Sequence, residues 1–532
     1  MNKKQLSTLC SSAPLRLCAI ICAVLVAALL IAAPPALAKY DGSLGWYGVS
    51  WNQSTDSYSR RGDLVDFAAA ASPGDDYLPV QRLMRRCVMN DSGVVVYYLD
   101  PTDSTKKYNG ASASLDGTDG QVMVEIPKFY IRTSYSSNVH SWDISLTPRD
   151  GFFPHPAFYK DGAWVDYRYM GAYEGSLWDD DTTAMYSDAD AVTADTYDDG
   201  DKLCSITAQC PKTNETRAEF REAASDRGAG WRNQEYDITT AVQLLYLVEY
   251  ADFDSQSMIG KGRTMFSSGA WTVAGTGVGD YIGRTGYSNS YGNATATYPA
   301  MGSQRSSALD ISAIDTSQAA YCDFVSYRGI ENFYGNVWQW VDGINVGLAG
   351  THDGGDNEAT VMTDSGESWP TNSLIGATIT NTTDSSSGTI TANTGTTITV
   401  ASLSGGTDND WDTGDAFVVS NIVWLCSNEA NFADDAYTNY DALYDTSGDR
   451  AVLHNADGYA GALEQIYTGF LATDVTGSST TKVCDYYYQD TGWRVVGFGG
   501  AAGSASAAGA FCVSAGSTSS YVHAAIGGRL CY

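Results

Sequence analysis

The chain has 532 residues, with 62 Asp or Glu against 31 Lys or Arg and a formal net charge of −31. So acidic a surface repels phosphate backbones, which excludes nucleic acid as a partner and fits solubility outside the cell. The length allows two or three domains with buried cores.

The first 38 residues are typical of a secretory signal peptide. The basic start MNKKQLSTLC precedes an apolar run from Leu17 to Ala33 and the small-residue pattern Ala36-Leu37-Ala38. We therefore expect Sec-type export with cleavage after Ala38, and an extracellular or cell-surface location. An uncleaved membrane anchor is the alternative, since the apolar run is just shorter than a usual membrane span.

The sequence that follows predicts an α+β protein with few helices. Residues 39–120 alternate short apolar runs with turns, which indicates a β-rich N-terminal region, and residues 121–373 form the first part of the main domain. Thr216 and Glu219 form a capping box for one helix, which Gly228 ends. A second helix is predicted over 237–251, with Ala241, Leu244, Leu245 and Val248 on one buried face.

Residues 374–421 are Thr-rich, alternating and broken by turns, which predicts a small all-β insertion. Within it Asp408, Asp410 and Asp412 occupy alternate positions, as in a calcium loop. The glycine falls one position late and the closing Glu is missing, so the pattern favours a solvated turn over a calcium site. We expect no other metal or cofactor.

Two sequence islands in the second half of the chain are the most informative. The first is ENFYGNVWQWVDG, in which Trp338 and Trp340 would face the same side of a strand and Gly335 and Asn336 make a tight approach to it. The second is DYYYQDTGWRVVGFGG, followed by a stretch of small residues and IGGRLCY. The first island lies in the first part of the main domain, and the second lies in its second part, residues 422–532.

The islands, with the helix segment AEFREAASDRGAGW before them, resemble the C-type-lectin-type fold of the formylglycine-generating (sulfatase-modifying) superfamily. Within it, MRRCVMNDSG, VMVEIPKFY, GNVWQWVDG and CDYYYQDTGWRV are similar to variable target proteins of diversity-generating retroelements, many of them phage-tail or bacterial-surface proteins. The resemblance implies that a reverse transcriptase rewrites adenines near the end of the gene. Asn-type codons rewritten in this way never become Lys, Glu, Gln, Met or Trp, and none of these occurs from Gly499 to Ala525.

The resemblance also implies which positions vary and which are frame. Ala508, Gly509, Ala510, Phe511, Val513 and Ile526 would be frame, with Phe511 and Val513 alternating on a strand and pointing inward. The variable positions would form a ligand-binding face on loops, with Tyr521 and His523 as its anchors. They are Ala501, Gly503, Ser504, Ser506, Ala507, Ser514, Gly516, Ser517, Tyr521, His523 and Ala525.

The expected function is therefore binding of a protein or cell-surface ligand, as a receptor, adhesin or host-recognition protein. Display in many copies would strengthen such binding through avidity. We do not expect an enzyme. The oxidase relatives use a reactive cysteine pair and iron-dependent relatives use clustered histidines, whereas this sequence has no close pair at Cys512 and Cys531 and its histidines are widely separated. A sulfatase-modifying-type oxidase and a purely structural tail or surface protein are the alternatives.

The cysteines fit an exported protein. Eight remain after Ala38, and an oxidising compartment permits disulfides, with Cys204–Cys210 and Cys512–Cys531 as the pairs we expect. For Cys512 and Cys531 the alternative is packed thiols. No CxxC spacing occurs, which argues against zinc.

Overall fold

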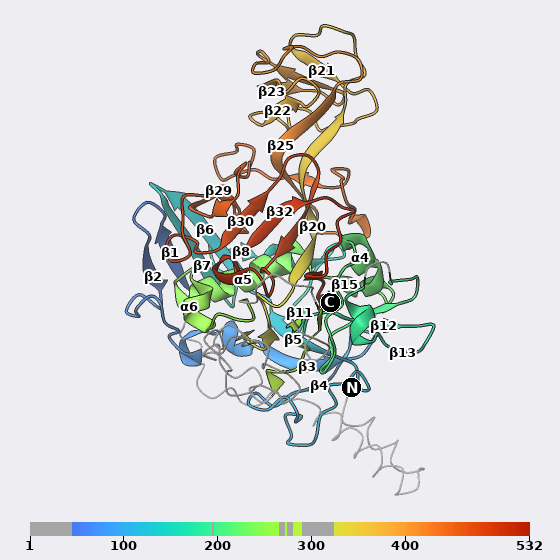
Figure 1. Ribbon diagram of the computed structural model, residues 1–532. Coiled ribbons are helices and arrows are strands. Elements are labelled where there is room, and N and C mark those ends of the chain that lie inside the picture. The colour runs from blue at the N-terminus through green and yellow to red at the C-terminus, as the bar shows by residue number, and fades with distance from the viewer. Residues whose placement is uncertain (1–44, 194–195, 265–271, 274–279, 290–323) are drawn as a thin grey trace, which may run out of the picture. The chain divides into compact units, whose positions relative to one another are not determined.

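A computed structural model describes residues 45–193, 196–264, 272–273, 280–289 and 324–532. The predicted signal peptide, residues 1–38, and Cys322 lie outside the described residues. Helices and several β-sheets together make an α+β fold, as the sequence predicted (Figure 1). Within the described ranges, no helix is both long enough and apolar enough to cross a membrane.

Helix α5 (Tyr236–Tyr250) lies in the largest hydrophobic core and contacts strands of two sheets. The prediction gave it one buried face, but every residue except Asp237 is buried. The reason is its surroundings: α5 packs against β1 (Tyr47–Asn52), β7 (Val139–Ser145) and β20 (Trp338–Thr351), so no face remains for water.

Helix α4 (Arg217–Ser225) begins at the predicted capping box. Thr216 accepts a hydrogen bond from the Glu219 backbone, and the Glu219 carboxylate accepts one from the Thr216 backbone. The helix ends at Ser225, before the predicted stop at Gly228. Two shorter helices are α3 (Asp188–Ala191) and α6 (Ser255–Ile259).

Strand pairing crosses the expected boundary at residue 120, so the N-terminal β-rich region is not a separate unit. Strand β1 pairs with β7, and β3 pairs with β5. The five-stranded sheet, in spatial order, is β2 (Ser57–Gly62), β1, β7, β6 (Tyr130–Ser136) and β8 (Phe153–Pro154). The six-stranded sheet is β15 (Arg232–Asn233), β34 (Leu530–Cys531), β11 (Tyr167–Gly171), β5 (Gln121–Pro127), β3 (Arg85–Met89) and β4 (Val95–Tyr98).

A twelve-stranded sheet contains both sequence islands and the insertion. Its central pair is β20 with β25 (Ala416–Leu425), followed on one side by β31 (Arg494–Phe498), β32 (Val513–Ser517), β30 (Tyr486–Gln489) and β27 (Gly458–Tyr459). Strand β33 (Ile526–Gly527) pairs with β20 in parallel, and β26 (Asp441–Ala442) pairs with β25. The insertion adds β22 (Thr378–Asn381), β23 (Ser387–Asn393), β24 (Thr397–Val400) and β21 (Val361–Thr363).

The insertion consists of strands, but it begins earlier than the predicted residue 374. Strand β21 precedes that point, and Met362 and Trp369 belong to the same hydrophobic cluster as Trp411 and Phe417. This cluster also includes Leu348 of β20, so the two long strands β20 and β25 carry side chains into both cores.

The remaining strands form small sheets. They are β9 (Tyr159–Lys160) with β10 (Ala163–Trp164); β12 (Ser176–Asp179) with β13 (Ala184–Met185) and β14 (Lys202–Cys204); β16 (Thr272–Val273) with β17 (Asp280–Ile282); β18 (Ser326–Tyr327) with β19 (Ile330–Glu331); and β28 (Ala462–Leu463) with β29 (Ala472–Asp474).

Candidate ligand-binding site

The two sequence islands meet in one row of paired residues across four neighbouring strands (Figure 1). Trp340 of β20 pairs with Gly497 of β31, Gly497 pairs with Ser514 of β32, and Ser514 pairs with Tyr488 of β30. Along this row the residues are therefore large, small, small and large. Because directly opposed residues share a face of the sheet, the two small residues leave a notch between two aromatic side chains.

Trp338 closes one side of this notch. It lies two positions before Trp340 on β20 and so faces the same side, as the sequence predicted. Its ring meets that of Tyr488 edge to face, with centroids 5.7 Å apart and planes at 77°. A Cβ placed on Gly497 would lie 3.7 Å from the Trp338 ring and 3.9 Å from the Trp340 ring.

The notch forms the floor of a pocket of about 370 Å³. Such a volume is at the small end of the range for ligand-binding pockets. The residues that line it are Trp338, Trp340, Tyr488, Gly497, Ala501, Gly503, Ser504, Ser514, Ser517, Tyr521, His523, Ala525 and Ile526.

Eight of the eleven positions expected to vary lie around this pocket. Tyr521 is 41% exposed, and Ser517 and His523 are half-buried. Ala501 and Ala525 are buried and line its recess, although a variable face was expected to be exposed. The other six in the lining are exposed or half-buried, and they are Gly503, Ser504, Ser514, Ser517, Tyr521 and His523.

Three predicted positions do not line the pocket. Ser506 and Ala507 lie in a short 3-10 helix, Ala505–Ala507, where the Ser506 hydroxyl is 2.8 Å from that of Tyr459. Gly516 lies on β32 between the pocket residues Ser514 and Ser517, but a β-bulge keeps it out of the pocket lining. From Ser514 to Ser517 the chain advances three residues, while the paired segment of β31 advances only two, from Gly497 to Val495. The extra residue turns Ser517 to the pocket face.

Side chains from outside the variable stretch hold the backbone of the first loop, residues 501–510. Gln256 of α6 donates hydrogen bonds to the carbonyls of Ala505 (2.8 Å) and Ala508 (2.7 Å). Gln243 of α5 donates to the Ala510 carbonyl at 2.8 Å, and Asp485 accepts from the Phe511 backbone at 2.7 Å. The loop is thus fixed through main-chain atoms, which every loop sequence retains.

The expected frame residues are buried, except for Val513, which is half-buried. Phe511 points inward but not on a strand, because β32 begins only at Val513. Phe511 packs edge to face against Phe253 and Phe470, with ring centroids 4.7 and 4.9 Å away. It therefore anchors the loop to the main core.

The second loop, residues 518–525, presents an aromatic pair. The rings of Tyr521 and His523 are parallel within 6°, with centroids 6.1 Å apart. Burial lowers the pKa of His523, which favours the neutral ring at neutral pH. Nδ1 of His523 accepts a hydrogen bond from the Ala525 backbone at 3.1 Å, which fixes the ring against its own loop.

The pocket lining is uncharged. Among the described residues that form it, none is Asp, Glu, Lys or Arg. Hydroxyl groups come from Ser504, Ser514, Ser517 and Tyr521, while the floor is aromatic and aliphatic. A charged group entering this pocket would lose its hydration without gaining an ionic partner, so the site suits neutral groups.

The sequence analysis did not single out Tyr488 or Gly497 as site residues. Both lie in the second island, and the alternation of Tyr486 and Tyr488 on one strand was a signal for one of them. Gly497 could not be recognised, because its role depends on which strands become neighbours.

The predicted disulfides are wrong. Cys204, Cys210, Cys512 and Cys531 are all buried free thiols. Cys204 lies against the Arg227 guanidinium (2.8 Å), while Cys210 packs in a small cluster with Ile282 and Val337. Cys512 precedes β32 of the twelve-stranded sheet and Cys531 lies on β34 of another sheet. The spacing of these cysteines along the chain did not show that the members of each expected pair lie in different surroundings.

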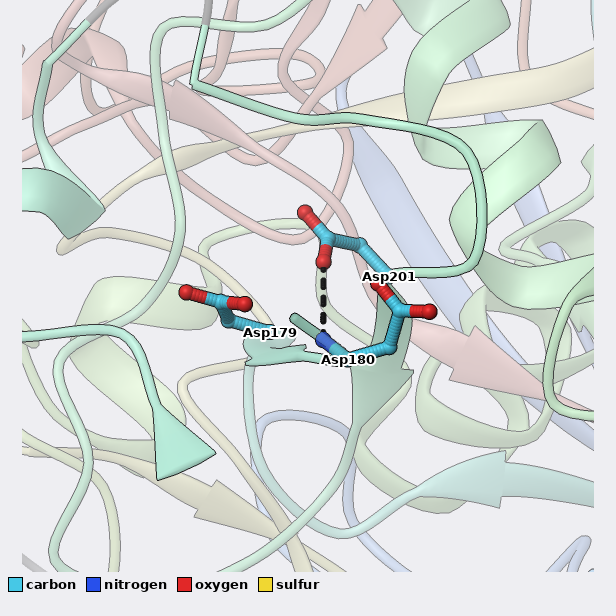
Figure 2. Close-up of side chains that lie close together, drawn as sticks. All are labelled: Asp179, Asp180 and Asp201. Atoms are coloured by element: carbon cyan, nitrogen blue, oxygen red, sulfur yellow. Dashed lines mark hydrogen bonds between the residues drawn. The ribbon is translucent and has the colours of Figure 1, made fainter. Parts of the chain in front are cut away.

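Two groups of acidic side chains lie outside the pocket. The carboxylates of Asp408, Asp410 and Asp412 come within 4.8 Å of one another, as do those of Asp179, Asp180 and Asp201 (Figure 2). Asp201 is already engaged by protein donors, namely the backbone of Asp180 (3.2 Å) and the Tyr186 hydroxyl (2.6 Å). Exposed acidic groups are common without an ion, so neither group is assigned a function.

Comparison with protein-family models and with curated proteins finds no match to this chain.

Proposed function

We propose that the chain is an exported ligand-binding protein with a C-type-lectin-type fold and a diversified binding face. It would be a variable target protein of a diversity-generating retroelement, carried on a cell surface or a phage tail and made with a signal peptide cleaved after Ala38. The observation that carries this proposal is the convergence of eight expected variable positions on one pocket. That convergence supports recognition because those positions come from two loops and the strand β32 between them, all of which turn side chains to the same pocket.

The construction of the face also supports binding by variation. Its first loop is held by hydrogen bonds to main-chain atoms and by the buried Phe511. Exposed side chains such as Tyr521 can then change without removing what holds the loop in place. Antibody loops use the same division, with Tyr for contact area and Ser or Gly for adaptable hydrogen bonding.

The oxidase alternative receives less support. Burial raises the pKa of Cys531 to about 12 and that of Cys512 well above its usual value, so neither thiol is an ionised nucleophile at neutral pH. Cys512 also lies just before β32 of the twelve-stranded sheet, whereas Cys531 lies on β34 of the six-stranded sheet. A reactive pair would need neighbouring thiols and a positive charge to lower their pKa values.

A library of the full chain tests the proposal. Randomising the nine expected positions that are not buried, which leaves out Ala501 and Ala525, and selecting on unrelated purified proteins should yield clones that bind different targets. Their unfolding temperatures should remain within a few degrees of the parent, since surface changes usually alter stability by less than about 0.5 kcal/mol each. Binding is measured by interferometry on purified clones.

A matched library at the frame positions Ala508, Gly509, Ala510 and Phe511 is the control, and most of its members should fail to fold. The proposal is rejected if both libraries lose folding equally, or if selected clones show no target preference. The retroelement origin further requires a near-copy of the 3′ end of the gene in neighbouring DNA, with mismatches confined to template adenines.

A further inference from the structure

The floor and the rim of the pocket belong to different classes of residue. Trp338, Trp340, Tyr488 and Gly497 form the floor, and none of them is among the positions expected to vary. The rim carries seven of the eight expected variable positions in the lining, and the eighth, Ser514, lies in the notch itself. A version whose rim changes but whose residue 514 stays small would therefore keep the same aromatic floor.

The floor is shaped to accept one flat group. Gly497 and Ser514 leave the notch between Trp340 and Tyr488, and Trp338 stands beside it, edge to face with Tyr488. Aromatic rings attract a further ring edge to face or offset-stacked, and these contacts add to the gain from burying apolar surface. The absence of charged side chains in this lining, which lies within the described residues, disfavours an anion and leaves a cation only the faces of the rings to bind.

The same lining favours an aromatic side chain over a sugar. A sugar ring needs several directed hydrogen bonds, typically from carboxylates or amides, and this lining contains neither. Its polar groups are hydroxyls, including that of Tyr488, two indole N–H groups and one imidazole, and the Trp340 N–H is already donated to the Glu215 carbonyl. Protein hot spots, in contrast, consist of a buried aromatic anchor inside a ring of small and polar residues that exclude water. The pocket has this arrangement, with its aromatic residues at the base and small residues around them.

We infer that the floor, in every version with a small residue at position 514, is a subsite for a single uncharged aromatic side chain, Phe, Tyr or Trp, of a protein partner. This inference rests on the proposed function, which it deepens by naming the chemistry shared by the partners of those versions. The rim then selects among partners by what surrounds the ring, and the floor supplies a common anchor.

Gly497 provides a direct test. Its backbone is not left-handed and a Cβ there would make only ordinary contacts, so a side chain can be added without strain. Gly497→Val should fill the notch, and Gly497→Ala should fill part of it. Gly395, in the insertion, is the control, because a Cβ there would also meet its nearest atoms at 3.8 and 3.9 Å.

The probes are p-cresol and indole, with methyl α-glucoside and tetramethylammonium for comparison, titrated into the full chain and followed by NMR. We expect p-cresol and indole to bind one to one in the millimolar range or tighter. Gly497→Val should weaken this binding at least tenfold and Gly497→Ala severalfold, whereas Gly395→Val should leave it unchanged. If Gly497→Val fails to fold, Gly497→Ala decides.

Three results would overturn the inference. They are no binding of either ring to the wild type, preferential binding of the glucoside or of tetramethylammonium, or undiminished ring binding by folded Gly497 variants. The outcomes are separable from those for the proposed function. Ring binding can persist when rim libraries show no target preference, and selected rim clones can bind targets that Gly497→Ala does not weaken.

Discussion

Arg529 and Tyr521 lie eight positions apart and show how differently frame and face are built. The Arg529 guanidinium is fully buried and donates hydrogen bonds to Gln339 Oε1 (2.7 Å) and to the carbonyls of Gly171, Glu331 and Asn332. From the sequence it could have paired with an acid or lain on a solvated face. Instead it satisfies main-chain carbonyls, tying the segment after the second loop to β11 and to the first sequence island.

Replacing Arg529 should therefore cost far more stability than replacing a residue of the face. Arg529→Met removes the donors of three buried carbonyls and should destabilise the fold by about 3–5 kcal/mol. Tyr521→Ala should change stability by less than about 0.5 kcal/mol. Both are measured by guanidinium unfolding followed through tryptophan fluorescence.

Arg494→Met is the control for removing a guanidinium near the site. Arg494 is half-buried and pairs with the exposed Asp490 at 3.0 Å, a kind of ion pair that contributes at most about 1 kcal/mol. A loss for Arg529→Met no larger than that for Arg494→Met would contradict the role given to Arg529.

At the scale of elements, helix α6 positions the first loop of the face. Gln256→Leu keeps the side-chain size but removes both hydrogen bonds to the loop carbonyls of Ala505 and Ala508. Amide exchange in residues 501–510 should become at least tenfold faster, because opening the loop then breaks fewer hydrogen bonds and costs less free energy. Exchange in residues 518–525, which Gln256 does not contact through these bonds, should not change, and equal acceleration of both loops would refute a local tether.

The sequence predicted those elements whose causes are local. The capping box at Thr216 and Glu219, and the alternation of Trp338 and Trp340, each depend on residues within a few positions. The β-bulge that turns Ser517 into the pocket depends on the register between β31 and β32, which the sequence of neither strand specifies. For the same reason, Gly497 gains its role only once Trp340 and Ser514 become its neighbours.

Across the whole molecule, the excess of acid extends into the core. Glu174 is buried, where Asn332 and Asn336 donate hydrogen bonds to it at 3.0 and 2.6 Å, and Asp237 of α5 accepts one from Ser427 at 2.7 Å. Burial raises the pKa of Glu174 from 4.5 to about 7 and that of Asp237 from 3.8 to about 6. Folding therefore favours the protonated form of both groups.

The sign of the pH dependence follows. A raised carboxyl pKa gives stability that is complete below pH 4.5 and is lost as the pH rises through about 7, amounting to about 3 kcal/mol for Glu174. Between pH 5 and pH 8, Glu174→Gln should remove this loss, so its free energy of unfolding should rise relative to that of the wild type as the pH increases, as measured by guanidinium unfolding at both values. His140 and His155 act in the opposite direction, because burial lowers their pKa values to about 4 and about 3, but they do so in both proteins. Glu222→Gln removes one charge from an exposed position of α4 and controls for net charge. A pH dependence in Glu174→Gln equal to that of the wild type would mean that Glu174 is ionised in the folded protein throughout this range.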